Sequence, residues 1–264
     1  MANSHVIAGL HAAGAPPAVR KIAFRDIKEA LAKGVDDFMA MPSHLAFIGL
    51  IYPLLGIGLA ALTFTSNALP LLFPLASGFA LIGPLAAVGL YEISRRREAG
   101  EQVSWLTAFE VLRNPNIISI AGVGILLMAI FVAWVAVAQA IWNATLGHLP
   151  PMAFGAMIHA AFTTPEGQRL LLFGNAAGFV FALLVLVLTV VSVPMLIDRP
   201  RVGIGSALGA SVQACLVNPV PMAIWGALVA VLLLLGSIPA FIGLAVVMPV
   251  LGHATWHLYK RVVT

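Results

Sequence analysis

Six long apolar runs constrain this chain more than any other feature of its 264 residues. They cover residues 45–64, 68–91, 117–139, 170–195, 220–236 and 238–258. A helix of about 20 residues crosses a hydrocarbon core about 30 Å thick. In lipid every backbone group must be hydrogen-bonded to the protein itself, so only α-helices and closed β-barrels span a membrane. The runs are continuously apolar, whereas the strands of a membrane β-barrel alternate. They therefore predict an all-α, polytopic membrane helical bundle with six transmembrane helices.

The composition agrees with a membrane protein and limits its chemistry. Hydrophobic residues make up 61% of the chain and charged residues only 9%, against about 25% charged residues in soluble domains. Cys215 is the single cysteine, which excludes an intramolecular disulfide framework and a multi-thiolate metal or iron–sulfur site within one chain. Residues 1–19 lack the basic start and apolar stretch of a secretory signal. We expect them to form a flexible tail before a single membrane domain, residues 20–264.

The least certain boundary separates the fifth run from the sixth. Only the turn Gly236-Ser237-Ile238-Pro239 lies between them, so one continuous helix of almost 40 residues is the alternative. That helix would be about twice as long as a bilayer requires, with turn residues at its centre. The sequence therefore favours two helices.

The basic residues predict which way the spans point. Thirteen of the 14 Lys and Arg residues fall on the side of the two termini, and Arg169 alone falls opposite. The positive-inside rule then places both termini in the cytoplasm. The net charge of +4 is explained by this topology and by contact with the lipid bilayer, so it does not indicate nucleic-acid binding. The run Arg95, Arg96 and Arg97 is interpreted as a topology determinant at a helix end.

Three segments on the side of the termini have an amphipathic pattern, and each precedes an outbound span. They cover residues 22–41, 104–114 and 205–218 and end before Pro42, Pro115 and Pro219. In the first, Ile27, Leu31, Val35 and Phe38 form one apolar stripe, with charged residues elsewhere. This pattern is typical of helices that lie in the membrane interface.

The spacing of these segments predicts an internal repeat. Each of three units would contain an interfacial helix followed by a transmembrane hairpin, and the second would carry an insertion outside the membrane at residues 140–169. About a dozen residues of this insertion form an apolar patch, too few to span, so we expect a short helix on the outer face. The alternative to a repeat is that any protein with an even number of spans shows hairpin periodicity.

Several pieces of the chain resemble a known family. They are LIYPLLG, LLFPLASGFALIGPLAAVGLYEISRRREAG, VSVPMLIDR and PVLGHATWHLYKR. They look like uncharacterised bacterial integral membrane proteins grouped as a domain of unknown function, over most of residues 20–262. The resemblance implies a multi-span protein of the bacterial inner membrane and transfers no activity. Some members are labelled cytochrome c oxidase subunit I-like, but the histidines here are too few and too peripheral for an oxidase core.

Four polar residues at the inner ends of the returning spans are the ligand candidates: Glu92, Asp198, His253 and His257. The two histidines are four residues apart and share one helical face, a spacing that can chelate a metal or hold a haem when a third ligand is near. Glu92 or Asp198 would be that ligand. The simpler interpretation, hydrogen bonding to helix ends or headgroups, is favoured, and no cofactor is predicted.

The remaining signals indicate packing more than chemistry. Gly174, Asn175 and Gly178 form a small-residue contact face on the fourth span, and no charged residue lies in the middle third of any span. The sequence therefore favours a non-enzymatic accessory or scaffold subunit that binds other membrane-protein subunits. The alternative is a small-solute or ion transporter with a cytoplasm-facing site, because Pro84, Pro194 and Pro249 interrupt the inner halves of the returning spans.

Overall fold

The computed structural model describes residues 18–40, 81–149, 153–239 and 241–264, together with the single residues 54, 57, 58, 61, 74, 75 and 78. The helices are α2 (Phe24–Ala40), α5 (Gly83–Ala86), α6 (Val88–Glu98), the 3-10 helix η2 (Trp105–Arg113), α7 (Ile117–Ala144), α8 (Phe154–Thr163), α9 (Pro165–Thr189), α10 (Ser192–Asp198), α11 (Ile204–Val217), α12 (Pro219–Ser237) and α13 (Leu244–Val262). Within these residues the one β-type contact is an isolated antiparallel bridge between Val19 and Val263.

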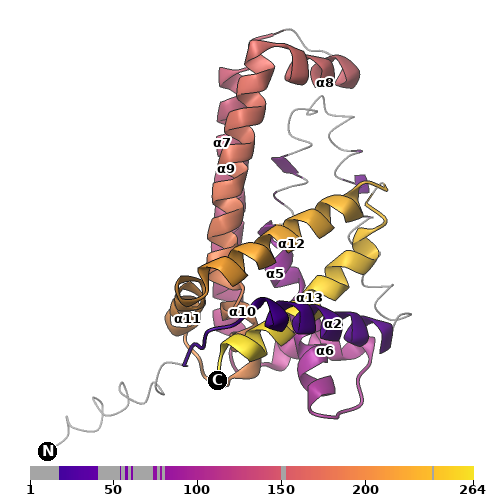
Figure 1. The fold of residues 1–264 in the computed structure, drawn as a ribbon, viewed down its shortest axis with the longest axis vertical. Coiled ribbons are helices and arrows are strands. Elements are labelled where there is room, and N and C mark those ends of the chain that lie inside the picture. The colour runs from indigo at the N-terminus through magenta and orange to yellow at the C-terminus, as the bar shows by residue number, and fades with distance from the viewer. Residues whose placement is uncertain are drawn as a thin grey trace, which may run out of the picture.

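A long hairpin of α7 and α9 rises from the rest of the molecule, and α8 lies across its far end (Figure 1). Trp134 of α7 is buried between the two helices and contacts the Phe181 ring, with 5.6 Å between ring centroids. Its indole nitrogen donates a 2.8 Å hydrogen bond to the Pro74 carbonyl oxygen, as a buried tryptophan usually requires. Trp134 therefore fixes how α7 and α9 face each other.

At the other end of this hairpin, α2, α6, α10 and α13 pack into a layer that contains the C-terminus (Figure 1). Small residues allow the helices to approach closely. A Cβ atom at Gly34 of α2 would lie 2.6 Å from the backbone nitrogen of Ala254 in α13, and one at Gly252 would lie 2.6 Å from the Leu90 side chain of α6. These two glycines therefore set the spacing of α13 from its neighbours.

Two buried asparagines connect the layer to the apolar helices. The amide nitrogen of Asn116, just before α7, donates to the carbonyl oxygens of Leu196 and Arg199 at 2.8 and 2.5 Å. Asn218, just before α12, accepts a 2.8 Å hydrogen bond from the Ile22 backbone nitrogen. Each side chain provides the hydrogen-bond partner that buried backbone groups of another segment need.

Several helices match their predicted ranges. The predicted span 117–139 is α7, the span 220–236 is α12, the segment 205–218 is α11, and the short outer helix expected within 140–169 is α8. The predicted span 170–195 lies within the helical segment Pro165–Asp198, which comprises α9 and α10. Most of the predicted span 45–64 and nearly all of the 1–19 tail lie outside the described residues. The predicted span 68–91 is described at residues 74, 75, 78 and 81–91, and its end lies in α5 and the start of α6.

Within the described residues, three helical segments are long and apolar enough to cross a bilayer: Ile117–Ala144, Pro165–Asp198 and Pro219–Ser237. The chain is thus an all-helical membrane protein, and the six-span arrangement remains a prediction. The sixth predicted span, 238–258, corresponds to α13, which begins at Leu244 and is outside this set. Its C-terminal half carries polar and basic side chains and is buried among α2 and α6.

Two of the three amphipathic segments differ from the expectation. Residues 104–114 form the 3-10 helix η2. In α2 the buried residues are Ile27, Ala30, Gly34, Asp37 and Phe38, and Val35 is exposed. Ile27 and Phe38 of the predicted stripe are therefore confirmed as buried, Leu31 is half-buried, and Val35 lies outside the contact face. Gly34 allows the close approach of this face to α13.

We expect Gly34→Ala to lower the free energy of unfolding by about 1–3 kcal/mol, because the added methyl group meets the α13 backbone. Gly209→Ala is the matched control. Gly209 is in the interior of α11, and a methyl group added there would have nothing within 4 Å, so alanine should raise stability by about 0.5–1 kcal/mol. Thermal unfolding in detergent, followed by thiol-dye labelling of the buried Cys215, measures both. Equal changes in the two variants would contradict the packing described.

Candidate functional site

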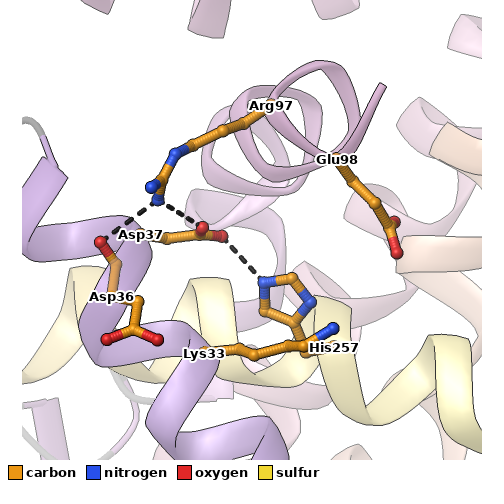
Figure 2. A pocket seen from close by; sticks show the side chains of 6 residues that line it. All are labelled: Lys33, Asp36, Asp37, Arg97, Glu98 and His257. Atoms are coloured by element: carbon orange, nitrogen blue, oxygen red, sulfur yellow. Dashed lines mark hydrogen bonds and ion pairs between the residues drawn. The ribbon is translucent and has the colours of Figure 1, made fainter. Parts of the chain in front are cut away.

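The Asp37 carboxylate of α2 lies at the centre of a buried polar network between α2, α6 and α13. One oxygen, Oδ2, accepts hydrogen bonds from the Ser94 hydroxyl at 2.6 Å and from His257 Nε2 at 2.9 Å. The other, Oδ1, accepts from the Arg97 guanidinium at 2.6 Å. Arg97 also donates to the Asp36 carbonyl oxygen at 3.1 Å (Figure 2). Three helices are therefore joined by one side chain.

His253 extends this network into the interior. Its ring is fully buried, and Nδ1 lies 2.7 Å from the Ser94 oxygen and 3.8 Å from Asp37 Oδ2. Because the Ser94 proton is donated to Asp37, the hydroxyl oxygen can only accept from His253, which places a proton on Nδ1. The opposite ring nitrogen, Nε2, has no hydrogen-bond partner in the described structure.

The Asp37 carboxyl is charged at neutral pH despite its burial. Burial by itself raises the pKa of Asp37, but the hydrogen bonds from His257 and Ser94 and the neighbouring imidazoles lower it further than burial raises it. The net result is a pKa below the usual range of an aspartic acid. The centre of the network is therefore an anion held by polar and cationic donors.

A pocket of about 260 Å³ opens next to the network (Figure 2). It is lined by Lys33, Asp36, Asp37, Arg97, Glu98 and His257. Asp37 and His257 thus have one side in the buried network and the other at the pocket, whereas His253 is not among the residues that line the pocket. The pocket belongs to the layer that contains the C-terminus, at the opposite end of the α7–α9 hairpin from α8 (Figure 1).

The structure separates the four ligand candidates that the sequence suggested. His253 and His257 share the Asp37 network, but neither Glu92 nor Asp198 belongs to it. Glu92 is buried in α6, with both oxygens bonded to Arg95 at 2.9 and 2.7 Å and a further bond from Arg96 at 2.6 Å.

Asp198 binds residues at the end of α13. It accepts a 2.7 Å hydrogen bond from the Tyr259 hydroxyl and faces the Lys260 ammonium at 3.4 Å. Neither carboxylate is therefore placed to complete a site with the histidine pair. Among the described residues, no group of three or more His, Cys, Asp or Glu side chains is arranged to hold a metal ion.

The arginine run has defined partners. Arg95 and Arg96 pair with Glu92, and Arg97 pairs with Asp37 at 2.6 Å. The sequence predicts a topology determinant here. In the structure, each arginine also neutralises a buried carboxylate: Arg95 and Arg96 lie three and four residues after Glu92 on α6, and Arg97 reaches Asp37 of α2.

The three packing candidates on α9 differ in their surroundings. A Cβ atom at Gly178 would lie 3.4 Å from the Trp134 ring, so this glycine faces α7. Nothing lies within 4 Å of such an atom at Gly174. Asn175 is exposed, and its amide donates a 2.7 Å hydrogen bond to the Leu171 carbonyl oxygen of its own helix.

Sequence reasoning missed Asp37 and Ser94 and gave Arg97 a different role. One signal in the sequence could have identified Asp37. It falls on the same helical stripe as Ile27, Ala30 and Gly34, and a charged residue on a buried stripe needs a partner. Ser94 carried no signal, since a single serine near a helix end is common.

Glu92→Gln tests the buried ion pair. Burial by itself raises the pKa of Glu92, but the hydrogen bonds from Arg95 and Arg96 outweigh it and hold the pKa below its usual value. A lowered folded-state pKa stabilises the fold above the unfolded pKa, and this stabilisation is lost as pH falls through the folded pKa. We expect the variant to lose about 2 kcal/mol at pH 7, and the difference from wild type to shrink below about pH 4.

Thermal unfolding of both proteins from pH 7 to pH 3 measures this difference. Glu101→Gln is the control, because Glu101 is exposed and 3.5 Å from Arg96, an arrangement worth less than about 1 kcal/mol. A Glu92→Gln effect that stays constant down to pH 3 would contradict the pairing.

The middle of the chain is similar to a known protein family. A family model described as "Predicted integral membrane protein (DUF2189)" matches residues 71–198, a stretch that includes α5 to α10 and just under half of the chain. No curated protein and no solved structure matches the chain. The match confirms the resemblance seen in the sequence: residues 71–198 are similar to the predicted integral membrane proteins of unknown function described by this family model.

Proposed function

We propose that this membrane protein is a non-enzymatic accessory or scaffold subunit, which binds other membrane-embedded helices through the exposed face of α9. We further propose that it resides in the bacterial inner membrane with both termini in the cytoplasm. The distribution of Lys and Arg supports this orientation, since only Arg169 falls on the side of α8.

The observation that carries the proposal is the exposed amide of Asn175. It lies within a helical segment that is long and apolar enough to span a bilayer, and its amide nitrogen donates to a carbonyl oxygen of its own helix. In lipid, an exposed amide is better satisfied by a neighbouring helix, and small residues beside it let that helix approach. Gly174 provides such a space, because nothing lies within 4 Å of a Cβ atom there.

Asn175→Leu tests the contact. We expect the wild-type protein, purified in mild detergent, to migrate in an assembly larger than its 27.7 kDa monomer. The variant should weaken this assembly by about 1–2 kcal/mol, roughly tenfold in Kd, because the interhelical hydrogen bond is lost. Size-exclusion chromatography with light scattering and blue native electrophoresis measure it.

Val180→Leu is the matched control, since Val180 is an exposed apolar residue of the same helix. This substitution keeps the lipid-facing character of α9 and should leave the assembly unchanged. A wild-type protein that migrates as a lone monomer, or equal weakening by both substitutions, would overturn the proposal.

A second candidate function is a small-solute or ion carrier. The pocket supports it, because buried Asp37 and His257 meet the exposed Lys33 and Asp36 there. Ionisable side chains packed within a membrane protein often mark a substrate or ion pathway.

The carrier is tested by uptake of labelled amino acids, polyamines and monovalent cations into vesicles. A His253→Ala, His257→Ala double variant should lose about tenfold in uptake, because a hydrogen bond to a charged group is worth about 1.5–3 kcal/mol. His159→Ala, which changes an exposed histidine of α8, is the control. Unchanged uptake in the double variant would remove the support for a carrier.

A further inference from the structure

The 3-10 helix η2 has its large apolar side chains on the side that faces away from the protein. Leu106, Phe109 and Leu112 are 55%, 58% and 66% exposed. A 3-10 helix has three residues per turn, so these side chains lie above one another and form a single exposed row, the η2 row. Trp105 lies beside it, with its ring nearly perpendicular to that of Phe109 and 6.0 Å between ring centroids.

The opposite side of η2 is occupied by the protein itself. Val111 is buried, and a Cβ atom at Gly89 of α6 would lie 2.8 Å from the Cβ atom of Ala108. Glu110 forms an ion pair with Arg96 of α6. These contacts fix η2 on α6 and leave the η2 row uncovered. A contiguous exposed apolar patch of this kind marks a binding surface.

The distance along the chain to α7 places the η2 row at the level of the lipid headgroups. α7 begins at Ile117, four residues after η2 ends at Arg113, a separation of at most about 14 Å. α7 has 28 residues, a length of about 42 Å, and a bilayer with its headgroups is about 40–45 Å thick. When α7 spans the membrane, its first turn and η2 therefore lie in the headgroup region.

A hydrogen bond to the end of another apolar segment holds η2 at the same level. The side-chain amide of Asn114, directly after η2, donates a 3.2 Å hydrogen bond to the Ile197 carbonyl oxygen. Ile197 is in the last turn of α10, where the apolar segment Pro165–Asp198 ends. η2 is thus tied to the ends of two segments that can cross a bilayer, so an exposed apolar row at this height meets lipid.

Arg113 has the charge that an anionic lipid surface attracts. It is exposed at the end of η2 and forms no ion pair with any described residue. Tryptophan is enriched at membrane interfaces, and basic side chains near the surface bind anionic headgroups. We propose that the η2 row inserts into the headgroup layer of the leaflet on the side of the termini, and that Arg113 binds the phosphate groups of anionic phospholipids there.

This lipid contact is independent of the subunit contact proposed above. It involves η2 and a phospholipid, whereas the subunit contact involves α9 and another membrane-embedded helix. A loss of assembly in Asn175→Leu and a loss of lipid contact at η2 are therefore separate results. The sequence predicts an interfacial helix at residues 104–114, and the packing of η2 on α6 identifies the side chains that are left for lipid.

Quenching of a fluorescent label on η2 tests the proposal. Phe109→Cys, in a Cys215→Ala background, is labelled with bimane, and the full chain is reconstituted in lipid nanodiscs. We expect brominated acyl chains to quench this label strongly and acrylamide in the water to quench it weakly. Gln102→Cys is the matched control, because Gln102 is an exposed polar residue shortly before η2, and its label should show the opposite pattern.

The same label measures which lipid is preferred. The nanodiscs contain phosphatidylcholine and phosphatidylglycerol in equal amounts, with bromine on only one of the two lipids. We expect phosphatidylglycerol to be enriched about fivefold beside the Phe109→Cys label, the factor that corresponds to one basic residue near an anionic surface. Arg113→Gln should remove this enrichment. Lys28→Gln, which removes the same charge from an exposed residue of α2, should leave it unchanged.

Three results would contradict the proposal. Acrylamide quenching of the Phe109→Cys label as strong as that of the Gln102→Cys label would show that the η2 row lies in water. A label shielded from both quenchers would show that protein covers the row, from this chain or from a partner. An enrichment that Arg113→Gln leaves unchanged would overturn the contact with lipid phosphate. If Phe109→Cys does not fold, Leu112→Cys replaces it, and the same three results decide.

Discussion

The packing of α2, α6 and α13 depends on the hydrogen bonds that satisfy the buried carboxylate of Asp37. A buried carboxylate without partners costs several kcal/mol, so its donors have to be in place whenever the helices are packed. Asp37 takes these donors from α6 and α13, where Ser94 and Arg97, like His253 and His257, are about one turn apart. The contact at Gly34 brings α2 near enough to α13 for these distances. The close approach of the helices and the pairing of Asp37 are therefore one constraint, because a side chain at position 34 would both separate the helices and leave the carboxylate unpaired.

Hydrogen bonds from side chains to buried backbone groups connect this polar layer to the apolar helices. The segment Pro165–Asp198 breaks near Val191, whose backbone nitrogen is satisfied by the Ser211 hydroxyl of α11 at 3.2 Å. After α10, the chain is held to the start of α7 by Asn116, which bonds the Arg199 carbonyl oxygen and accepts from the Val202 nitrogen at 3.0 Å. Because the breaks in these helices are closed by side chains from other segments, the hairpin and the layer are held in a fixed arrangement at those points.

Most helix positions could be predicted from the sequence, since apolar runs and prolines are local signals. Pro219 begins α12, as expected for a proline in the first turn of a helix. The site could be predicted only in part. The pairing of His253 with His257 follows from a spacing of four, but the carboxylate between them comes from α2, about 220 residues earlier. No pattern within α2 identifies its partner. The apolar stripe predicted on α2 is confirmed at Ile27 and Phe38, but Ala30 and Gly34 also belong to the buried face and Val35 does not. The close approach to α13, which needs a glycine at position 34, is not visible in α2 alone.

The location of the charged residues limits what the polar layer can do. Neither α7 nor α12 contains an ionisable side chain, and those of the segment Pro165–Asp198 lie near its ends, at Glu166, Arg169 and Asp198. Within the described residues, proton-accepting side chains are therefore concentrated at one end of the apolar hairpin, next to the pocket. Carrying an ion across the bilayer through these three segments would require ionisable side chains in their middle, and the three segments have none there. This separation favours the proposed subunit contact, in which the apolar helices bind other membrane-embedded helices.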